Sequence, residues 1–352
     1  MINRILSKDS VWETIKKSKL PLVLYGTGNG ADAVIDELSR LGISLSAVVA
    51  SEGFVRKRDF RGFRVRSLSE VKEELGDFLL LIGFATCIPE VMSNIKELCT
   101  QHQTLMPVVP VFGNTLFNRN YAEANAQELE HCRSLLCDEE SRRVFDGMVQ
   151  FQFTGELDVL FSIESQRADA LKDILHLTDK EDMLDLGAYR GDTIEELLTL
   201  TGGYASVTAL EPDRKSFEKL KAYAENKENI TLYPYAVYSE NKELTFMGGG
   251  GRQSTLNSEG KYSVSAVAID HLLKGKKITY VKADVEGAEA EALKGMTKLL
   301  REQQPKLSIS CYHKTEDLCT LIPLLHSINQ SYKIHLRHHP YIPCWDTNLY
   351  CI

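Results

Sequence analysis

Residues 183–193, with the sequence MLDLGAYRGDT, place an apolar run directly before a glycine-rich turn, and this stretch decides the fold of the C-terminal half. The run MLDL predicts the end of a buried strand, and residues 194–200 predict the amphipathic helix that follows it. Gly187 lets the chain turn where a side chain would clash. The stretch therefore predicts the first strand, loop and helix of a parallel α/β sheet.

Two later segments have the same character and follow at the spacing of a doubly wound sheet. VTALEPD ends a second strand with Glu211, and ITYVKADVEGAE ends another with Asp284. Open α/β sheets bind ligands at the carboxyl ends of their strands. We therefore expect Asp185, Glu211 and Asp284 to surround one ligand, although Asp185 has the alternative role of capping its own turn.

The charge of the loop restricts the ligand. Asp185 and Asp192 would repel a pyrophosphate and suit a cationic or hydroxyl-rich ligand. S-adenosylmethionine has a positive sulfonium, a positive ammonium and a ribose diol, for which Glu211 at the tip of the next strand is a fitting acceptor. The sequence therefore predicts S-adenosylmethionine as the cofactor.

Five segments carry a resemblance to a known family. DLGAYRGDT, ALEPD, YAVYSENKELTF, VKADVEGAEAEALKG and LSISCYHKTEDL resemble, in this order, the motifs of the FkbM family of S-adenosylmethionine-dependent methyltransferases over about residues 160–352. The resemblance implies an α/β class I Rossmann-like domain that methylates hydroxyl groups of sugars or polyketide-type products. Two closing strands, YKIHLRHH and NLYCI, are typical of methyltransferases, in which a seven-stranded sheet has an antiparallel last strand. Tyr235 departs from the family, which usually has Asn there.

Position and resemblance together give a set of expected cofactor contacts. The loop should surround the methionine and ribose portions, Glu211 should bind the diol, and the resemblance places Ala236 beside the adenine. For Ala236 the alternative is that a small residue simply packs. The expected cofactor-binding residues are Asp185, Gly187, Ala188, Tyr189, Gly191, Thr193, Glu211 and Ala236.

The expected catalytic residues are Asp284, Glu286 and His313. The two acids flank a strand-to-helix junction, where they can orient a substrate hydroxyl, accept its proton or hold a divalent cation. Capping of the helix at 288–300 is their alternative role. His313 ends the next strand, so it should lie beside Asp284, and its ordinary pKa suits a general base or a group that positions the substrate; a structural histidine is the alternative.

A glycine-rich segment, GGGGRQST at 248–255, lies between two predicted strands. Methyltransferases place an active-site flap there, in which Arg252 and Ser254 would touch the substrate. An exposed loop is the alternative.

The N-terminal part has its own strand-and-helix alternation, which predicts a small parallel sheet over residues 1–115. Its loop GTGNGA, from Gly26 to Ala31, fits a dinucleotide motif between strand and helix. Ser51, however, stands where an NAD enzyme has its ribose-binding acid. The domain resembles the N-terminal Rossmann-like domain of some sugar acyltransferases, which implies a nucleotide sugar at this loop; a purely structural turn is the alternative.

Three regions are therefore expected. Residues 1–115 form a Rossmann-like domain, residues 116–175 a helical connector, and residues 176–352 the methyltransferase domain. The connector has three open roles: it packs the domains together, covers the cofactor site or forms a dimer seam.

Composition excludes several classes of protein. With 352 residues, 43% hydrophobic and 26% charged, the chain is typical of a soluble globular protein. Its net charge of −8 gives no general attraction to nucleic acid or anionic lipid. We expect neither a membrane span nor a signal peptide, hence a cytoplasmic protein. Eight cysteines without zinc spacing predict reduced thiols and no metal ligands.

Together these features predict an S-adenosylmethionine-dependent O-methyltransferase. The resemblance and the N-terminal domain point to a sugar hydroxyl of a bacterial glycoconjugate, such as a polysaccharide, or of its nucleotide-linked precursor. Two alternatives are an NAD-dependent oxidoreductase using GTGNGA and a noncatalytic binding protein that retains the cofactor fold. The identity of the acceptor, a need for a divalent metal and the oligomeric state stay open.

Overall fold

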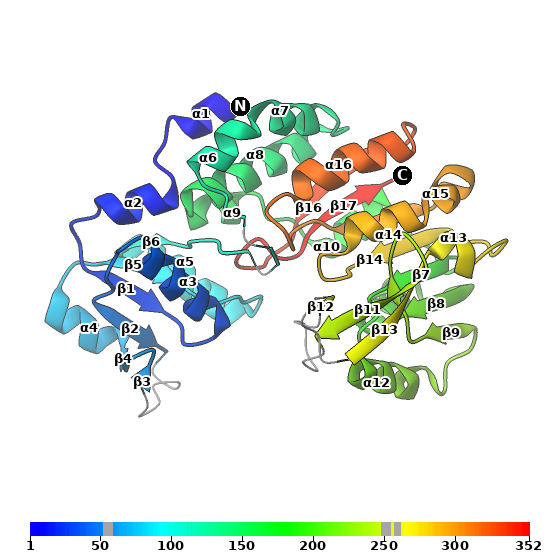
Figure 1. Cartoon of the computed structure of the whole chain (residues 1–352), viewed down its shortest axis with the longest axis horizontal. Coiled ribbons are helices and arrows are strands. Elements are labelled where there is room, and N and C mark those ends of the chain that lie inside the picture. Colours follow the sequence, from blue (N-terminus) through cyan, green and yellow to red (C-terminus); the bar gives the residue numbers. More distant parts are fainter. Residues whose placement is uncertain (52–58, 111, 114, 248–254, 257–261) are drawn as a thin grey trace. The chain divides into compact units, whose positions relative to one another are not determined.

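Figure 1 shows the computed structural model, which describes residues 1–51, 59–110, 112–113, 115–247, 255–256 and 262–352. The chain divides into two compact units. The first comprises Met1–Arg133, Arg142–Glu164 and His338–Asp346, and the second comprises Ser134–Ser141, Ser165–Arg337 and Thr347–Ile352. Residues 248–254 of the expected flap, with Arg252 and Ser254, lie outside the described residues.

The first unit contains a six-stranded sheet in the order β3-β4-β2-β1-β5-β6. The strands are β1 (Leu22–Tyr25), β2 (Ala47–Ala50), β3 (Asp59–Phe60), β4 (Phe63–Ser67), β5 (Leu79–Ile82) and β6 (Gln103–Leu105). All neighbours are parallel except the β3-β4 hairpin. Its two-residue turn has positive φ at Arg61 and Gly62, as tight hairpins require. The predicted strands β1, β2 and β5 thus form the centre of a wider sheet.

Helices surround this sheet, and apolar residues of α3 and of β1 and β5 share one buried core. The helices wholly or mostly in this unit are α1 (Ile2–Leu6), α2 (Val11–Lys17), α3 (Asn29–Arg40), α4 (Leu68–Leu75), α5 (Pro89–Gln101), α6 (Arg119–Ala124), α7 (Ala126–Ser134), α8 (Glu139–Thr154) and α9 (Leu157–Ser162). Most of the helices expected as a connector thus belong to the first unit, and the rest of that region belongs to the second.

The loop GTGNGA connects β1 to α3, and packing explains part of its glycine pattern. A Cβ at Gly30 would lie 2.7 Å from the carbonyl oxygen of Gly83, so a larger residue would push α3 away from the end of β5. Around Gly28, in contrast, no atom of the described residues, apart from its chain neighbours and the backbone of its own helix, lies within 4 Å of an added Cβ. The hydroxyl of Ser51, at the place of the missing acid, is hydrogen-bonded to the hydroxyl of Tyr25.

The second unit contains a seven-stranded sheet in the order β16-β17-β15-β14-β7-β8-β9. The strands are β7 (Asp182–Leu186), β8 (Ser206–Leu210), β9 (Ile230–Tyr233), β14 (Tyr280–Ala283), β15 (Lys306–Ser310), β16 (Ile334–His338) and β17 (Thr347–Cys351). The five strands from β9 to β15 are parallel, whereas β17 runs antiparallel to β15. The predicted fold class, a seven-stranded sheet with an antiparallel last strand, is confirmed.

A separate four-stranded sheet, in the order β10-β13-β11-β12, belongs to the same unit. Its strands are β10 (Ala236–Val237), β11 (Lys242–Met247), β12 (Thr255–Leu256) and β13 (Tyr262–Val267). The sequence ITLYPYAV at 230–237 is rich in strand-forming residues and predicts a single strand. In the structure it is divided between β9 of the large sheet and β10 of the small one. Pro234 separates them, because proline has no amide hydrogen to continue a strand ladder.

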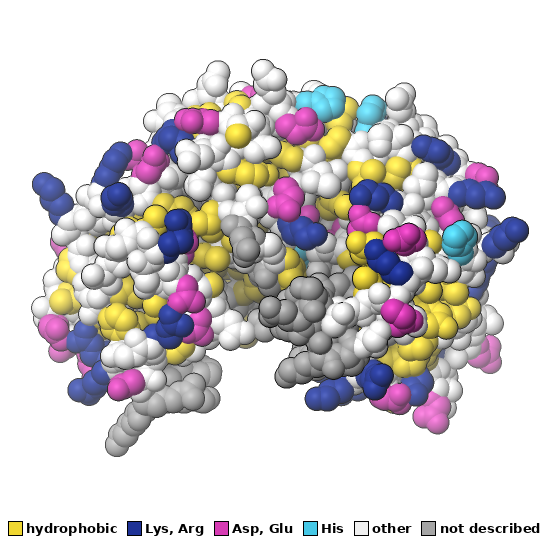
Figure 2. Space-filling model, viewed as in Figure 1, with side chains coloured by type: hydrophobic (Ala, Val, Ile, Leu, Met, Phe, Trp, Pro, Cys, Tyr) yellow, Lys and Arg dark blue, Asp and Glu magenta, His cyan; other side chains and the backbone are white. Residues whose placement is uncertain are grey.

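The helices of the second unit connect these strands. They are α10 (Arg167–Asp169), the π-helical turn η2 (Ala170–Ile174), α11 (Asp192–Thr201), α12 (Arg214–Ala224), α13 (Ile269–Leu272), α14 (Glu289–Gly295), α15 (Thr297–Gln303) and α16 (Asp317–Ile328). The helix expected over 288–300 is two helices, which meet at Met296. Among the described residues, no helix is long and apolar enough to cross a membrane. Charged side chains of both signs are interspersed over the described part of the face in Figure 2.

Candidate functional site

The loop after β7 depends on two glycines at positive φ. A Cβ at Gly187 would lie 1.9 Å from the carbonyl oxygen of Asp284, and one at Gly191 would lie 2.4 Å from the ring of Tyr223. The clash predicted at Gly187 is confirmed, and its partner is the backbone that follows β14. The loop after β7 and the chain after β14 are therefore in direct contact.

The backbone amides of this loop bind protein acceptors. Gly187 and Ala188 both donate to the carbonyl of Leu210 at 3.0 Å, and Tyr189 donates to Glu211 at 2.8 Å. The side chain of Ala188 is fully buried in the core beside β7 and α11. At these positions the loop amides hold the loop against the end of β8, so contacts with a ligand would have to come from other atoms.

Glu211 follows β8 and is 7% exposed. One of its oxygens accepts the Tyr189 amide and the other accepts the Asp213 amide at 2.7 Å. Burial raises the pKa of Glu211 to about 7, while these two hydrogen bonds oppose the shift. Each carboxylate oxygen can accept a second hydrogen bond. Glu211 is therefore held in place with capacity for two further donors, which fits the two hydroxyls of a ribose.

Asp185 of β7 forms a buried ion pair with Lys282 of the neighbouring strand β14. The strand register places it opposite Lys282 of β14, and the Lys282 ammonium lies 3.4 Å from its carboxylate. The same ammonium donates to the carbonyl of Gly187 at 2.8 Å. Burial raises the pKa of Asp185 to about 6, although Lys282 opposes this. Apart from the ion pair, neither oxygen of this fully buried carboxylate has a hydrogen-bond partner among the described residues.

The structure brings the three predicted catalytic residues together at the ends of β14 and β15. The Nε2 atom of His313 lies 3.3 Å from Asp284 and 3.4 Å from Glu286. Its Nδ1 atom lies 2.9 Å from Glu289, an acid that the sequence analysis did not single out. The imidazole is 4% exposed, whereas the Asp284 side chain is 33% exposed. We call these four residues the acid cluster.

The protonation of His313 follows from its neighbours. Burial alone lowers the pKa of His313, but Glu289, Asp284 and Glu286 outweigh burial and raise it to about 10. An imidazolium has no lone pair with which to accept a proton. In this arrangement His313 positions the carboxylates, and a base would have to be one of the acids. Sequence position indicated that His313 lies near Asp284, but not how many carboxylates surround it.

The two exposed members of the acid cluster differ in protonation. Burial raises the pKa of Asp284, yet Lys282 and His313 outweigh it and hold that pKa below its ordinary value. The Tyr312 hydroxyl donates to Asp284 at 3.3 Å. Burial raises the pKa of Glu286 to about 8, against the opposing charge of His313. Near neutral pH, Asp284 is therefore ionised and Glu286 is mostly protonated.

Two buried acids, Glu289 and Asp317, were not singled out in the sequence analysis. Glu289 is 1% exposed and accepts the amide of Val285 at 2.9 Å, so it holds the chain between β14 and α14. Asp317, 4% exposed at the start of α16, accepts the amide of Lys314 at 2.8 Å. Burial, with Glu289 second, raises the pKa of Asp317 to about 7. Acids at helix starts are common caps, so the sequence held no signal that separated these two from ordinary caps.

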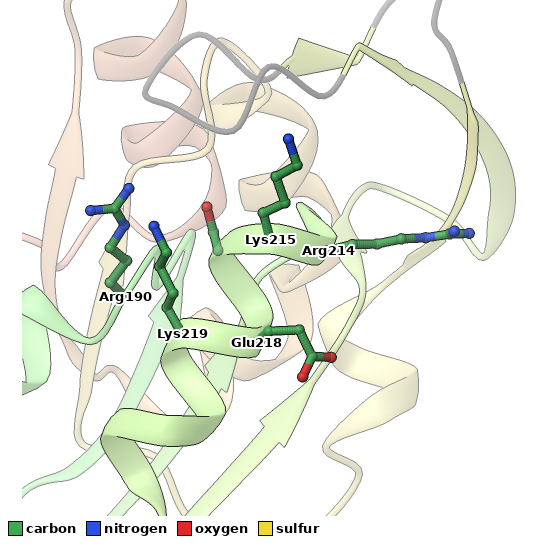
Figure 3. Close-up of a pocket in the computed structure, with 6 residues that line it drawn as sticks. Arg190, Arg214, Lys215, Glu218 and Lys219 are labelled. Atoms are coloured by element: carbon green, nitrogen blue, oxygen red, sulfur yellow. The ribbon is translucent and has the colours of Figure 1, made fainter.

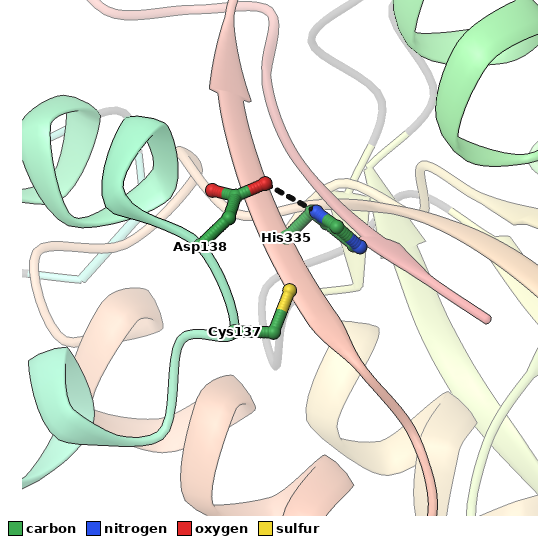
Figure 4. A group of neighbouring side chains, drawn as sticks. All are labelled: Cys137, Asp138 and His335. Atoms are coloured by element: carbon green, nitrogen blue, oxygen red, sulfur yellow. Dashed lines mark hydrogen bonds and ion pairs between the residues drawn. The ribbon is translucent and has the colours of Figure 1, made fainter.

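Within the part of the chain that the structure describes, two groups of side chains have atoms close enough for a metal ion. They are Asp284, Glu289 and His313 in the acid cluster, and Cys137, Asp138 and His335 (Figure 4). In the second group Asp138 accepts from His335 at 2.7 Å and from Arg337 at 2.9 Å. A guanidinium on the same carboxylate opposes a bound cation, so the acid cluster is the better candidate.

Two predicted cofactor contacts, Ala236 and Thr193, do not belong to the acid cluster. Ala236 is 4% exposed and packs against Tyr238 and Val264 in the core of the small sheet. Thr193 is 8% exposed in the first turn of α11. The packing of Ala236 matches its alternative role, and its contact with adenine stays a prediction.

Comparison with known proteins identifies the second unit. Residues 185–333 match the family model described as methyltransferase FkbM domain. These residues form an FkbM methyltransferase domain. The match confirms the predicted class of enzyme and its cofactor, S-adenosylmethionine. No curated protein matches the chain.

Three solved structures are similar to the chain, and the first of them supports its fold. The methyltransferase FkbM from Methylobacillus flagellatus KT is similar with 21% identity and a TM-score of 0.74, covering 100% of this chain and 93% of that one. Fibrillarin from Aeropyrum pernix has 12% identity and a TM-score of 0.36, covering 53% and 73%. An rRNA methylase from Streptococcus thermophilus has 16% identity and a TM-score of 0.35, covering 52% and 92%. The first of these shares the fold of both units, whereas the resemblance of the first unit to sugar acyltransferases stays a prediction.

Proposed function

We propose that this FkbM domain transfers a methyl group from S-adenosylmethionine to a sugar hydroxyl of a bacterial glycoconjugate, such as a polysaccharide, or of its nucleotide-linked precursor. The observation that carries the proposal is the contact between Gly187 and Asp284. It joins the loop expected to hold the cofactor to the acid cluster expected to hold the hydroxyl. The methyl donor and the acceptor hydroxyl would therefore bind at adjoining positions in one domain.

In this proposal, Glu211 accepts hydrogen bonds from the ribose hydroxyls, and the pair of Asp185 and Lys282 holds the loop that surrounds the methionine end. The fixed carboxylate of Glu211 supports this, because both of its oxygens are already oriented by backbone amides. S-adenosylmethionine supplies an activated methyl group, so the protein has to align the two reactants and remove one proton.

We assign the removal of the hydroxyl proton to Asp284. An alcohol O–H becomes strongly acidic as its oxygen gains the methyl group as a third substituent, so a carboxylate with a low pKa is a sufficient base late in the reaction. Asp284 is ionised, and its side chain is more exposed than that of His313. His313 and Glu286 then orient Asp284 and the hydroxyl.

The first test uses Asp284→Asn with methyl transfer and calorimetry of S-adenosylhomocysteine as separate readouts. We expect a loss of about 10²- to 10⁴-fold in methyl transfer, as for other general bases, with cofactor affinity unchanged. A matched control is Glu302→Gln, which removes an exposed acid of α15 paired with Lys298. If Asp284→Asn loses cofactor binding as well, Asp284 belongs to the cofactor pocket.

The nucleotide sugar at the first unit and a cytoplasmic location belong to the same proposal. The opening around Gly28 supports a ligand at this loop. A thermal-shift screen of the full chain with uridine and guanosine diphosphate sugars, compared between the wild type and Gly28→Val, tests the loop. A shift that is equal in both proteins, or absent from both, favours the structural role of GTGNGA.

A further inference from the structure

A pocket at the start of α12 has a charge that the proposed chemistry does not use. It has a volume of about 440 Å³ and is lined by Arg190, Arg214, Lys215, Ser216, Glu218 and Lys219. Four of these six side chains are cationic and one is acidic. In Figure 3, the side chains of Arg190, Lys215 and Lys219 extend to the same side of the helix start, whereas Glu218 points away.

Three of the four cations that line this pocket have no acid beside them among the described residues. Among the described residues, no carboxylate lies within ion-pair distance of Arg190, Lys215 or Lys219. The one acid of the lining, Glu218, is paired with Lys221 at 2.7 Å. The chain as a whole has a net charge of −8, so a group of four cations in one pocket is opposite in sign to the net charge of the protein. An anion between the cations would relieve their mutual repulsion.

The pocket adjoins the expected ribose site. Glu211 binds the amides of Tyr189 and Asp213, which directly precede the two arginines of the lining. The carboxylate of Glu211 thus fixes both segments that line the pocket. Asp213 in turn caps α12 by accepting the amide of Ser216 at 2.9 Å, which orders the helix start. The pocket is therefore built on the same carboxylate that we assign to the cofactor.

We infer that this pocket binds an anionic group, a phosphate or a carboxylate, of the methyl acceptor. The inference rests on the proposed function and narrows its substrate to anionic sugars. S-adenosylmethionine has no phosphate, and its carboxylate belongs to the methionine end, which is expected beside Asp185 and Gly187. An anion beside Glu211 is thus part of a second molecule. Arginine and lysine are the side chains that recognise phosphates and carboxylates, the first as a planar fork and the second as a point charge.

The experiment uses the full chain saturated with S-adenosylhomocysteine. Inorganic pyrophosphate, uridine diphosphate glucose and digalacturonate are titrated by calorimetry into the wild type, into Lys215→Gln/Lys219→Gln and into Lys274→Gln. The last variant is the control, because Lys274 is an exposed lysine of the same unit that does not line the pocket. We expect at least one anion to bind the wild type and the control equally, and the double variant about ten-fold or more weakly. Binding of the first two ligands alone assigns a phosphate, and binding of digalacturonate alone assigns a carboxylate.

Three results would overturn the inference. In the first, none of the anions binds the wild type. In the second, Lys274→Gln weakens binding as much as the double variant, which indicates nonspecific attraction. In the third, the double variant loses affinity for S-adenosylhomocysteine, which assigns the pocket to the cofactor. A wild type that does not bind S-adenosylhomocysteine contradicts the proposed function instead, so the two failures are distinguishable.

Discussion

Replacing Lys282 by Met should destabilise the protein by an amount that increases with pH above about 6. Lys282 and Asp185 form a buried ion pair, and the pKa of Asp185 is about 6 in its presence because burial raises it and Lys282 opposes the rise. Without Lys282 this pKa rises further. Below pH 6 the carboxyl is neutral in both proteins, so the missing charge matters little there.

The magnitude follows from linkage between ionisation and folding. The pKa of Asp185 in the folded protein lies above its ordinary value of 3.8, so ionisation opposes folding, and a still higher pKa lowers stability only at high pH. Each pH unit above 6 adds about 1.4 kcal/mol until the carboxyl of the variant ionises. Between pH 5.5 and 8 the penalty should therefore grow by about 2 to 3 kcal/mol. Loss of the hydrogen bond to Gly187 adds about 1 kcal/mol at both values.

Urea unfolding at pH 5.5 and 8 measures this penalty in the wild type, in Lys282→Met and in Lys282→Met/Asp185→Asn. The double variant has no carboxyl at residue 185, so the growth with pH should shrink to the smaller effect of Lys282 on Glu211 and Glu286. Lys277→Met is the matched control, because Lys277 pairs with Asp182 but is 75% exposed, and it should cost less than about 1 kcal/mol at both values. A penalty for Lys282→Met that is equal at pH 5.5 and 8 would refute the reasoning.

Three further predictions concern the loop and the acids. Glu211→Ala removes a partner of the ribose that is charged above its pKa of about 7 and is then worth about 1.5 to 3 kcal/mol. At pH 8 the Kd for S-adenosylhomocysteine should therefore rise about ten-fold or more by calorimetry, and an unchanged Kd in a folded variant removes Glu211 from the site. Gly187→Ala should lower thermal stability far more than Gly202→Ala, because both have positive φ but only the first forces a Cβ against Asp284; similar Tm losses would contradict this. Methyl transfer should be insensitive to a chelator, because the His313 imidazolium already supplies a cation to the acid cluster; loss of activity that Mg²⁺ restores would assign a metal to the acid cluster instead.

The sequence predicted the parallel sheet well because its signals are local. An apolar run that ends in a glycine turn, as in MLDLG, or in an acid, as in VTALE, indicates the end of a strand without knowledge of the rest of the chain. The division of ITLYPYAV between two sheets was missed, since the residues on both sides of Pro234 have equal strand preference and only pairing with distant strands separates them. The break at Met296 was missed for a similar reason: Gly295 lies against the carbonyl of Tyr238, a contact that spacing alone does not reveal.

The sequence predicted which residues lie at the candidate site, but it did not predict their charges and protonation states. Strand ends placed Asp284 and His313 side by side, as found. The pKa of His313 depends on how many carboxylates face the imidazole, and Glu289 comes from a helix start that looks like an ordinary cap. Lys282 was visible two residues before Asp284, yet its partner Asp185 follows from the register between β14 and β7. Protonation is a property of the packed site, so the sequence alone left the choice of base open.

Asp284 joins the two halves of this site through different atoms. Its carbonyl oxygen occupies the space that a side chain at residue 187 would need, so the backbone at Asp284 determines where the cofactor loop lies. Its carboxylate faces His313, and in the proposed function it faces the acceptor as well. A change confined to the carboxylate, as in Asp284→Asn, should leave the loop in place, whereas a change at Gly187 displaces the loop and Asp284 together. The two variants therefore separate alignment of the reactants from removal of the proton, which one structural contact otherwise links.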